Sequence, residues 1–134
     1  MNIEYINPSG VSKPKGFTHT IRISDIKNLL IISGQVAKNS QGEVIGKNDL
    51  SKQLIQVFKN IEANLKAAGV SFKDVVKMNI YTVDMPAFRK ALTENWNDLP
   101  IANLNNAPCQ TWIEVKGLAR PTYLIEIDAI AIKH

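Results

Sequence analysis

The chain has 134 residues, of which 45% are hydrophobic and 21% are charged, and its formal net charge is +4 at pH 7. This length and apolar content suit one folded domain spanning residues 1–134 and exclude a disordered chain. The single cysteine excludes an internal disulfide framework and a zinc site built on several thiolates. The basic residues form no long runs, so nucleic-acid binding is not indicated.

The amino-terminal residues 1–7 do not combine a basic segment with an apolar run, as a secretory signal does. The longest apolar stretches, such as residues 29–32, are far too short to span a bilayer. We therefore expect a soluble, cytoplasmic protein that has no membrane partner.

The first part of the chain predicts an arm followed by two strands. Prolines and glycines in residues 7–16 favour an irregular arm. Residues 17–24 alternate between β-branched or apolar and polar types, and residues 29–36 form a second apolar run, which predicts two strands. Ser33 and Gly34 interrupt the second strand, and a glycine there indicates a bulge or the close approach of another group.

The rest of the chain alternates helices with strands. Apolar residues at three- and four-residue spacing predict a helix that begins at its N-cap, Asp49, and ends at Gly69. A second helix begins at residues 84–86, with a proline in its first turn. The further predicted strands cover residues 75–83, 109–116 and 123–132.

The predicted order of elements is β-β-α-β-α-β-β. Two helices and about five strands in one small domain indicate an α+β fold in which both helices cover one face of a mixed sheet. The other face of the sheet must then be solvated or covered by a partner. The pattern therefore favours an oligomer.

The last two strands are predicted to pair as an antiparallel hairpin around residues 117–121, with Lys116 opposite Thr122. This register places an apolar face beneath the helices, made of Thr111, Ile113, Val115, Tyr123, Ile125, Ile127 and Ala129. The opposite, polar face carries Gln110, Trp112, Glu114, Leu124, Glu126 and Asp128. Trp112 is expected to line an interface or a pocket on that polar face.

Glu126 and Asp128 would lie about 7 Å apart along one strand. Two carboxylates at that separation can form an acid/base pair. The alternative is that both are simply solvated on an exposed face, and the pattern alone favours this alternative.

Other reactive residue types give weaker signals. His19 is a lone histidine in a strand, which is more typical of a hydrogen-bonded structural residue than of a catalyst. No metal-ligand spacing connects it with His134, so no metal site is expected. Cys109 has no histidine or base near it in the sequence, which favours a passive thiol.

Several motifs along the chain resemble the RidA/YjgF family. They are Ile-Ile-Ser-Gly-Gln-Val at 31–36, Ala-Ala-Gly at 67–69, Val-Val-Lys at 75–77, Ile-Glu-Val at 113–115 and Ile-Glu-Ile-Asp-Ala-Ile-Ala at 125–131. The resemblance implies a chorismate-mutase-like fold that assembles as a homotrimer with clefts between subunits. It also implies hydrolysis of reactive enamines and imines to a 2-keto acid and ammonia, with no metal or organic cofactor. Some members have instead been described as endoribonucleases or translation inhibitors.

The resemblance also assigns roles to individual residues. Glu126 corresponds to the family's glutamate that places or activates the attacking water, and Ser33 corresponds to its substrate-orienting serine, followed by Gly34. Phe17 stands where the family has a tyrosine, and Trp112 where many members have a cysteine. Phe17 and Trp112 are therefore expected to form walls of the site.

Gln110 stands where the family has an arginine that holds the substrate carboxylate. A neutral amide in place of a guanidinium would weaken that contact by about 2 kcal/mol, or roughly thirtyfold in affinity. Arg120 lies about 20 Å away along the predicted hairpin, so it could replace the missing charge only from another subunit.

The sequence therefore supports an imine or enamine hydrolase that acts on a small metabolite and whose substrate preference is altered at Gln110. The alternative is a trimeric module that binds small metabolites or regulates without catalysis. An endoribonuclease or translation inhibitor is the least favoured interpretation, because the charge is modest and no arginine and aromatic residues alternate along a strand.

Overall fold

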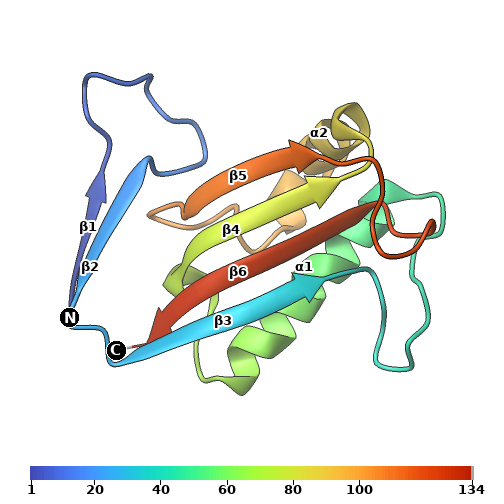
Figure 1. Ribbon diagram of the computed structural model, residues 1–134, viewed down its shortest axis with the longest axis horizontal. Coiled ribbons are helices and arrows are strands. Elements are labelled where there is room, and N and C mark those ends of the chain that lie inside the picture. The colour runs from blue at the N-terminus through green and yellow to red at the C-terminus, as the bar shows by residue number, and fades with distance from the viewer. Residues whose placement is uncertain (134) are drawn as a thin grey trace.

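A computed structural model describes residues 1–133 of the chain (Figure 1). The strands are β1 (Asn2–Ile6), β2 (Thr20–Ser24), β3 (Asn28–Gln35), β4 (Val75–Thr82), β5 (Cys109–Glu114) and β6 (Ile125–Lys133). The helices are α1 (Leu50–Ala67) and α2 (Met85–Asn95), with short 3-10 turns at Phe72–Asp74 and Trp96–Asp98. Within this described part, neither helix combines the length and the apolar character needed to cross a bilayer.

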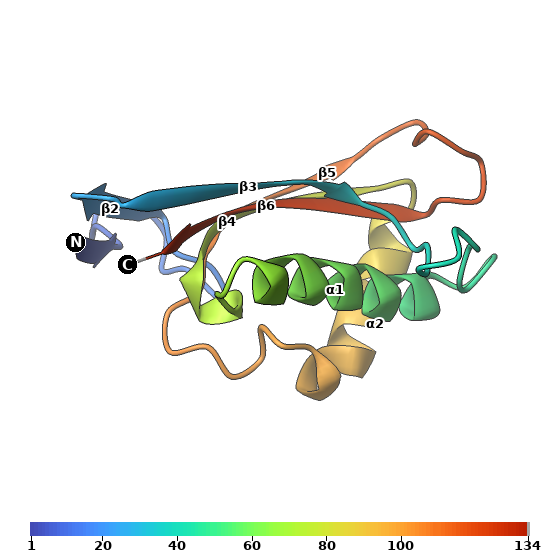
Figure 2. The ribbon, with the colours of Figure 1, turned by 90° about the horizontal axis from the view of Figure 1, so that it is seen from below.

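The main sheet has four strands in the order β3-β6-β4-β5, and β1 and β2 form a separate two-stranded sheet. Strand β6 runs antiparallel to both β3 and β4, whereas β5 runs parallel to β4. Figure 2 shows both helices on one side of the main sheet and no helix on the other. The predicted α+β fold, with a mixed sheet and two helices on one face, is confirmed.

Helix α1 supplies much of the core because one side of it is apolar along its whole length. The fully buried apolar side chains of this helix are Leu54, Val57, Phe58, Ile61 and Leu65. The Asp49 carboxylate caps its first turn by accepting a hydrogen bond from the backbone N–H of Lys52 at 3.1 Å. Gly69, at a φ of +74°, follows its last turn in the left-handed conformation that a glycine tolerates.

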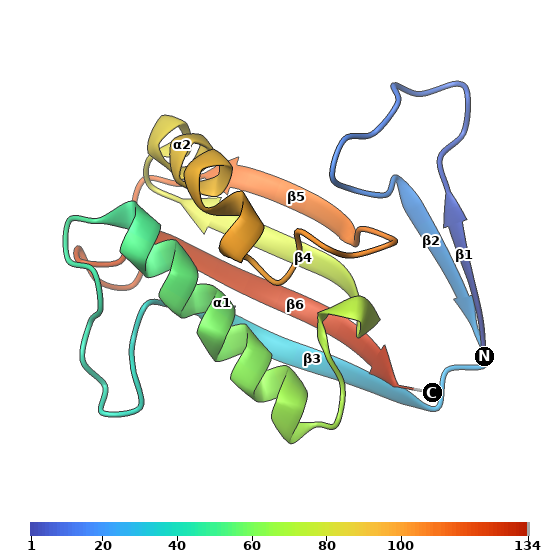
Figure 3. The same cartoon turned by 180° about the vertical axis from the view of Figure 1, so that it is seen from behind.

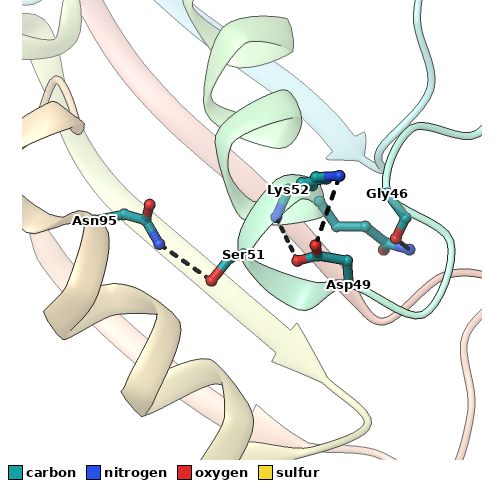
Figure 4. Close-up of polar contacts among 6 residues, drawn as sticks. Gly46, Asp49, Ser51, Lys52 and Asn95 are labelled. Carbon is teal, nitrogen blue, oxygen red and sulfur yellow. Dashed lines mark hydrogen bonds and ion pairs between the residues drawn. The ribbon is translucent and has the colours of Figure 1, made fainter.

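Helix α2 begins in the same way, because Asp84 accepts a hydrogen bond from the backbone N–H of Ala87 at 3.0 Å. The two helices meet near the start of α1, where the amide of Asn95 donates to the hydroxyl of Ser51 at 3.2 Å (Figure 4). The predicted N-cap Asp49 and the predicted start of the second helix at residues 84–86 are confirmed, and the structure adds Asp84 as the N-cap of α2.

The prediction of a hairpin between residues 109–116 and 123–132 is wrong. Strand β4 lies between β5 and β6. Its residue Met78 is opposite Gln110 of β5 on one side and opposite Ala129 of β6 on the other. The connection over residues 115–124 is long enough to pass β4, whereas a tight hairpin turn would force its two strands to be neighbours. A strand added between two others changes which residues are opposite each other, and the sequence pattern of β5 alone does not reveal it.

The changed pairing reverses the faces predicted for β5 while those of β6 hold. On β6, Ile125 and Ile127 are fully buried beneath the helices, so Glu126 between them points to the open face as predicted. On β5, Ile113 is 43% exposed on the open face instead of lying in the core. Gln110 and Trp112 therefore turn to the helix side of the sheet.

The amino-terminal part also differs from the prediction. Strand β1 falls in residues for which no element was predicted, and it pairs with β2, which is shorter than the predicted strand 17–24. As a result, β2 belongs to the small sheet and the main sheet has four strands. The interruption at Ser33 and Gly34 is confirmed, because the pairing of β3 with β6 shifts register between Ile32 and Gln35.

A buried glutamine ties the end of the β5–β6 connection to the helix layer. The Gln53 amide nitrogen donates to the carbonyls of Gly46 at 3.1 Å and Thr122 at 2.8 Å, and its oxygen accepts from the backbone N–H of Leu124 at 2.9 Å. The side chain is fully buried. Its loss would leave backbone groups from two loops without partners.

We predict that Gln53→Ala lowers the free energy of unfolding by about 2–4 kcal/mol, because it removes three buried hydrogen bonds and opens a cavity. Urea denaturation at a fixed protein concentration measures this change. Gln56→Ala is the matched control, because within residues 1–133 the Gln56 side chain bonds only to Asn60, one turn along the same helix, and it should cost about 1 kcal/mol or less. Equal losses in the two variants would contradict the role assigned to Gln53.

Candidate functional site

Glu126 lies over the bulge of β3. A Cβ atom built on Gly34 would lie 2.8 Å from the carboxyl carbon of Glu126 and closer still to one carboxylate oxygen. Any side chain at position 34 would therefore displace the carboxylate. The structure thus brings Gly34 and Glu126, both predicted as site residues, into direct contact, with Ser33 beside them on the same bulge.

Asp128, the second carboxylate on this strand, has a partner. It lies opposite Asn79, whose amide donates to it at 2.9 Å. Among the described residues, no side chain hydrogen-bonds to the Glu126 carboxylate. The two carboxylates therefore differ in what they can do: Asp128 is held by Asn79, whereas Glu126 can accept a proton or a hydrogen bond from a ligand or water.

The other predicted residues form a second group, on the helix side of the β5 edge. A cavity of 360 Å³ opens here, and its lining consists of Lys15, Gly16, Phe17, Arg89, Gln110 and Trp112. Phe17 and Trp112, which were predicted to form walls of the site, both line this cavity. Figure 3 shows the helix side of the sheet, with α2 near the end of β5 and α1 lying across β6 and β3.

The amide of Gln110 is committed within the protein. Its nitrogen donates to the carbonyl of Gly16 at 2.9 Å, and its oxygen accepts from the indole N–H of Trp112 at 3.0 Å. The Trp112 ring in turn meets Phe88 of α2 edge-on, with ring centroids 5.0 Å apart. Gln110 therefore fixes the arm and the tryptophan around the cavity and has one amide hydrogen and one oxygen lone pair left for a ligand.

A deeper chamber of 110 Å³ continues from this cavity toward the core. Lys15, Gly16, Gln110 and Trp112 line both spaces. The chamber is completed by the apolar side chains of Ile80, Leu92, Trp96 and Ile101. The cavity thus has a wide mouth that includes the cationic side chains of Lys15 and Arg89 and a narrow apolar interior.

Arg89 and Lys15 were missed by the sequence prediction. Arg89 directly follows Phe88, which belongs to the buried stripe of α2. Its position at the margin of that stripe is the one sequence signal that could have marked it as a residue facing a cavity. Lys15 lies in the arm, where sequence patterns give no side-chain direction. Arg120 lies in the 115–124 connection and is absent from the lining residues of this cavity.

The remaining candidates have local structural contacts. The His19 ring nitrogen lies 2.7 Å from the carbonyl of Ser12, and the ring meets Phe17 edge-on. The Cys109 thiol lies 3.8 Å from the carbonyl of His19. In residues 1–133, no group of three or more His, Cys, Asp or Glu side chains could hold a metal ion.

A separate cavity of 720 Å³ lies between the arm and the loop around Asn106. Tyr5 lines it, and burial, with a smaller effect of the nearby Asp74 charge, raises the pKa of this tyrosine above its usual value. Phe17 is the one predicted site residue that borders this space. This cavity therefore does not bring two of the predicted site residues together.

The two groups of predicted residues lie on opposite faces of the sheet. Glu126, Ser33 and Gly34 belong to the open face, whereas Gln110, Trp112 and Phe17 surround the cavity on the helix side. One chain cannot bring a ligand in that cavity to its own Glu126. A site that uses both groups requires a second copy of the chain.

A mixed sheet of this order with two helices on one face defines a small α+β domain, and a solved structure of a Rid protein shares this fold. Residues 12–133 match the family model described as endoribonuclease L-PSP. The chain therefore belongs to the endoribonuclease L-PSP family, which agrees with the RidA/YjgF resemblance of its motifs.

Individual relatives agree with this assignment. The chain is 35% identical over 132 residues to a RutC family protein of Pyrococcus horikoshii, covering 97% of this chain and 98% of the relative. It is 33% identical over 112 residues to the 2-iminobutanoate/2-iminopropanoate deaminase of Escherichia coli, covering 81% and 83% of the two chains. The crystal structure of the Rid protein YyfB from Yersinia pestis superposes with a TM-score of 0.86 at 34% identity, covering 99% of this chain and 100% of that one.

We predict that Gly34→Ala changes the side-chain rotamer of Glu126 while the free energy of unfolding falls by less than about 1 kcal/mol. The new Cβ would overlap a rotatable side chain rather than backbone, so the carboxylate swings away at little cost. A crystal structure of the variant and its urea denaturation test both parts. Gly10→Ala is the control, because a Cβ at Gly10 meets no atom within 4 Å. An unchanged Glu126 rotamer in Gly34→Ala would contradict the prediction.

Proposed function

We propose that the protein hydrolyses small 2-imino or 2-enamino acids to the corresponding 2-oxo acids and ammonia. The observation that carries this proposal is the Glu126 carboxylate, which lies over Gly34 beside Ser33 without a hydrogen-bonding side-chain partner among the described residues. The similarity to the Escherichia coli 2-iminobutanoate/2-iminopropanoate deaminase supports it.

The chemistry needs one base and a means of orienting the ligand. The ligand reacts as its protonated iminium form, which an enamine reaches when its C3 carbon takes a proton from solvent. Glu126 accepts a proton from water as the water oxygen bonds to the iminium carbon and the π electrons of the C=N bond move to nitrogen, which gives a carbinolamine. Glu126 then returns this proton to the nitrogen, the C–N bond breaks as ammonia leaves, and the hydroxyl oxygen forms the C=O bond of the 2-oxo acid as its own proton passes to solvent. Ser33 and the backbone N–H groups of the bulge orient the ligand, and the reaction needs no cofactor.

We further propose that the active form is a homotrimer in which the open sheet faces meet. This face carries exposed apolar side chains, with Ile31 77%, Leu29 57% and Ile113 43% exposed. Exposed apolar side chains gathered on one face of a sheet are typical of a surface that another subunit covers. Such an assembly would place Glu126 of one copy near the cavity at the β5 edge of the next.

A second candidate function is supported by Gln110. Its amide is held by Gly16 and Trp112, and it supplies no positive charge where the family has an arginine. A trimer with such clefts could bind a metabolite without converting it. The two candidates differ in whether ligand binding leads to turnover.

We expect Glu126→Gln to lower kcat for imine hydrolysis by about 10²–10⁴-fold, because the amide cannot accept the proton. Imino acids generated in situ by an L-amino-acid oxidase provide the substrate, and 2-oxo acid release gives the rate. Glu62→Gln is the control, since Glu62 is an exposed residue of α1, and it should leave the rate unchanged.

Equal rates for Glu126→Gln and the wild type would remove Glu126 from the mechanism. If the wild type shows no rate above background, yet binds 2-oxo acids equally well before and after Glu126→Gln, the non-catalytic module replaces the hydrolase.

A further inference from the structure

The mouth of the β5-edge cavity carries two cations and no carboxylate among its lining residues. Arg89 comes from α2 and Lys15 from the arm, so the two approach from different elements. In the described residues, every ion pair within 4.0 Å involves other cations: Arg22, Lys52 and Lys90. No carboxylate of the described residues therefore lies within 4.0 Å of Arg89 or Lys15.

The next residue on α2 provides an internal comparison. Lys90 lies 3.9 Å from Glu94, one turn along the helix, as is typical of a solvated helix surface. Arg89 has no such partner and borders a cavity instead. An unpaired guanidinium beside an aromatic wall is suited to bind a carboxylate through two parallel hydrogen bonds.

The chamber below the mouth determines which group can lie beyond a carboxylate bound at Arg89. Its volume of 110 Å³ corresponds to about three to four water volumes. Ile80, Leu92, Trp96 and Ile101 line the chamber but not the mouth. These four side chains offer no hydrogen-bond acceptor, and the Trp96 indole N–H is the single donor among them. A branched aliphatic or small aromatic group would gain free energy there, whereas a methyl group would leave most of the space unfilled.

We propose that Arg89, assisted by Lys15, binds the carboxylate of the ligand and that the chamber binds an apolar side chain. The preferred ligands are then 2-oxo and 2-imino acids with branched aliphatic or aromatic side chains. The identification of the ligand as an acid of this type rests on the proposed function, whereas the anionic head and apolar tail follow from the cavity itself. The positive charge absent at Gln110 is thus supplied from α2.

Isothermal titration calorimetry of the full-length protein tests the inference without requiring turnover. The probes are 4-methyl-2-oxopentanoate, pyruvate and the uncharged ketone 4-methyl-2-pentanone. The wild type should bind 4-methyl-2-oxopentanoate at least about tenfold more tightly than pyruvate, because the longer side chain buries more apolar surface.

Arg89→Ala should weaken binding of both acids by about tenfold to a hundredfold, because a charge-assisted contact is lost, and should leave binding of the uncharged ketone unchanged. Arg89→Lys should restore part of the loss. Lys90→Ala is the matched control, and its Kd should stay within about twofold of the wild type. Leu92→Phe, which narrows the chamber, should weaken 4-methyl-2-oxopentanoate more than pyruvate.

An Arg89→Ala protein that binds the acids as the wild type does would overturn the assignment of Arg89, and equal affinities for the two acids would overturn that of the chamber. If the wild type hydrolyses imines but Arg89→Ala does not change the affinity for the acids, only the role of Arg89 is contradicted and the proposed reaction stands. Arg89-dependent binding without hydrolysis contradicts the proposed reaction and leaves this inference standing.

Discussion

Strand β4 hydrogen-bonds to β6 along one edge and to β5 along the other, and this double pairing determines on which face Glu126, Gln110 and Trp112 lie. Through β6 it sets Glu126 opposite Tyr81 on the open face. Through β5 it sets Trp112 opposite the buried Ile80, on the helix side. Because neighbouring residues across a sheet share a face, the same strand separates the carboxylate from the cavity. The division of the site into two parts therefore follows from one feature of the backbone.

The division has a functional consequence for the proposed reaction. A monomer holds a potential base on one face and a potential binding cavity on the other, so it cannot use both on one ligand. Assembly would then be part of the chemistry, since a neighbouring copy has to complete each site. The exposed Ile31 and Ile113 on the open face give such an assembly a surface to bury.

Much of the fold could be predicted from local patterns in the sequence. The helices follow from apolar spacing, from the cap at Asp49 and from the proline in the first turn of α2, and these signals lie within a few residues of the structure they produce. The bulge at Gly34 could be predicted for the same reason. The position of β4 between β5 and β6 could not, because strand order depends on contacts between distant segments. The prediction of which β5 side chains face the helices was wrong for the same reason. Alternation along a strand predicts two faces but does not show which of them the helices cover.

The site could be predicted only in part, for a related reason. Glu126, Ser33 and Gly34 lie on two strands whose motifs carry the family resemblance, and the structure brings Gly34 and Glu126 together. Arg89 belongs to no motif, and its relevance depends on the position of α2 over the β5 edge. Gln110 is the opposite case, because the sequence identifies it as a site residue. Only the fold shows that its amide is already hydrogen-bonded to Gly16 and Trp112.

The contacts of the arm along β5 have a consequence for solubility. β5 is the last strand of its sheet, and an unprotected edge strand exposes backbone groups that can pair with another chain. Near the start of this strand, Thr18 donates from its hydroxyl to the carbonyl of Ala107 at 2.6 Å and from its backbone to Pro108 at 3.3 Å, and Gln110 binds Gly16. The segment that walls the cavity thus also shields this end of the edge, so any ligand that moved it outward would expose backbone groups to intermolecular pairing.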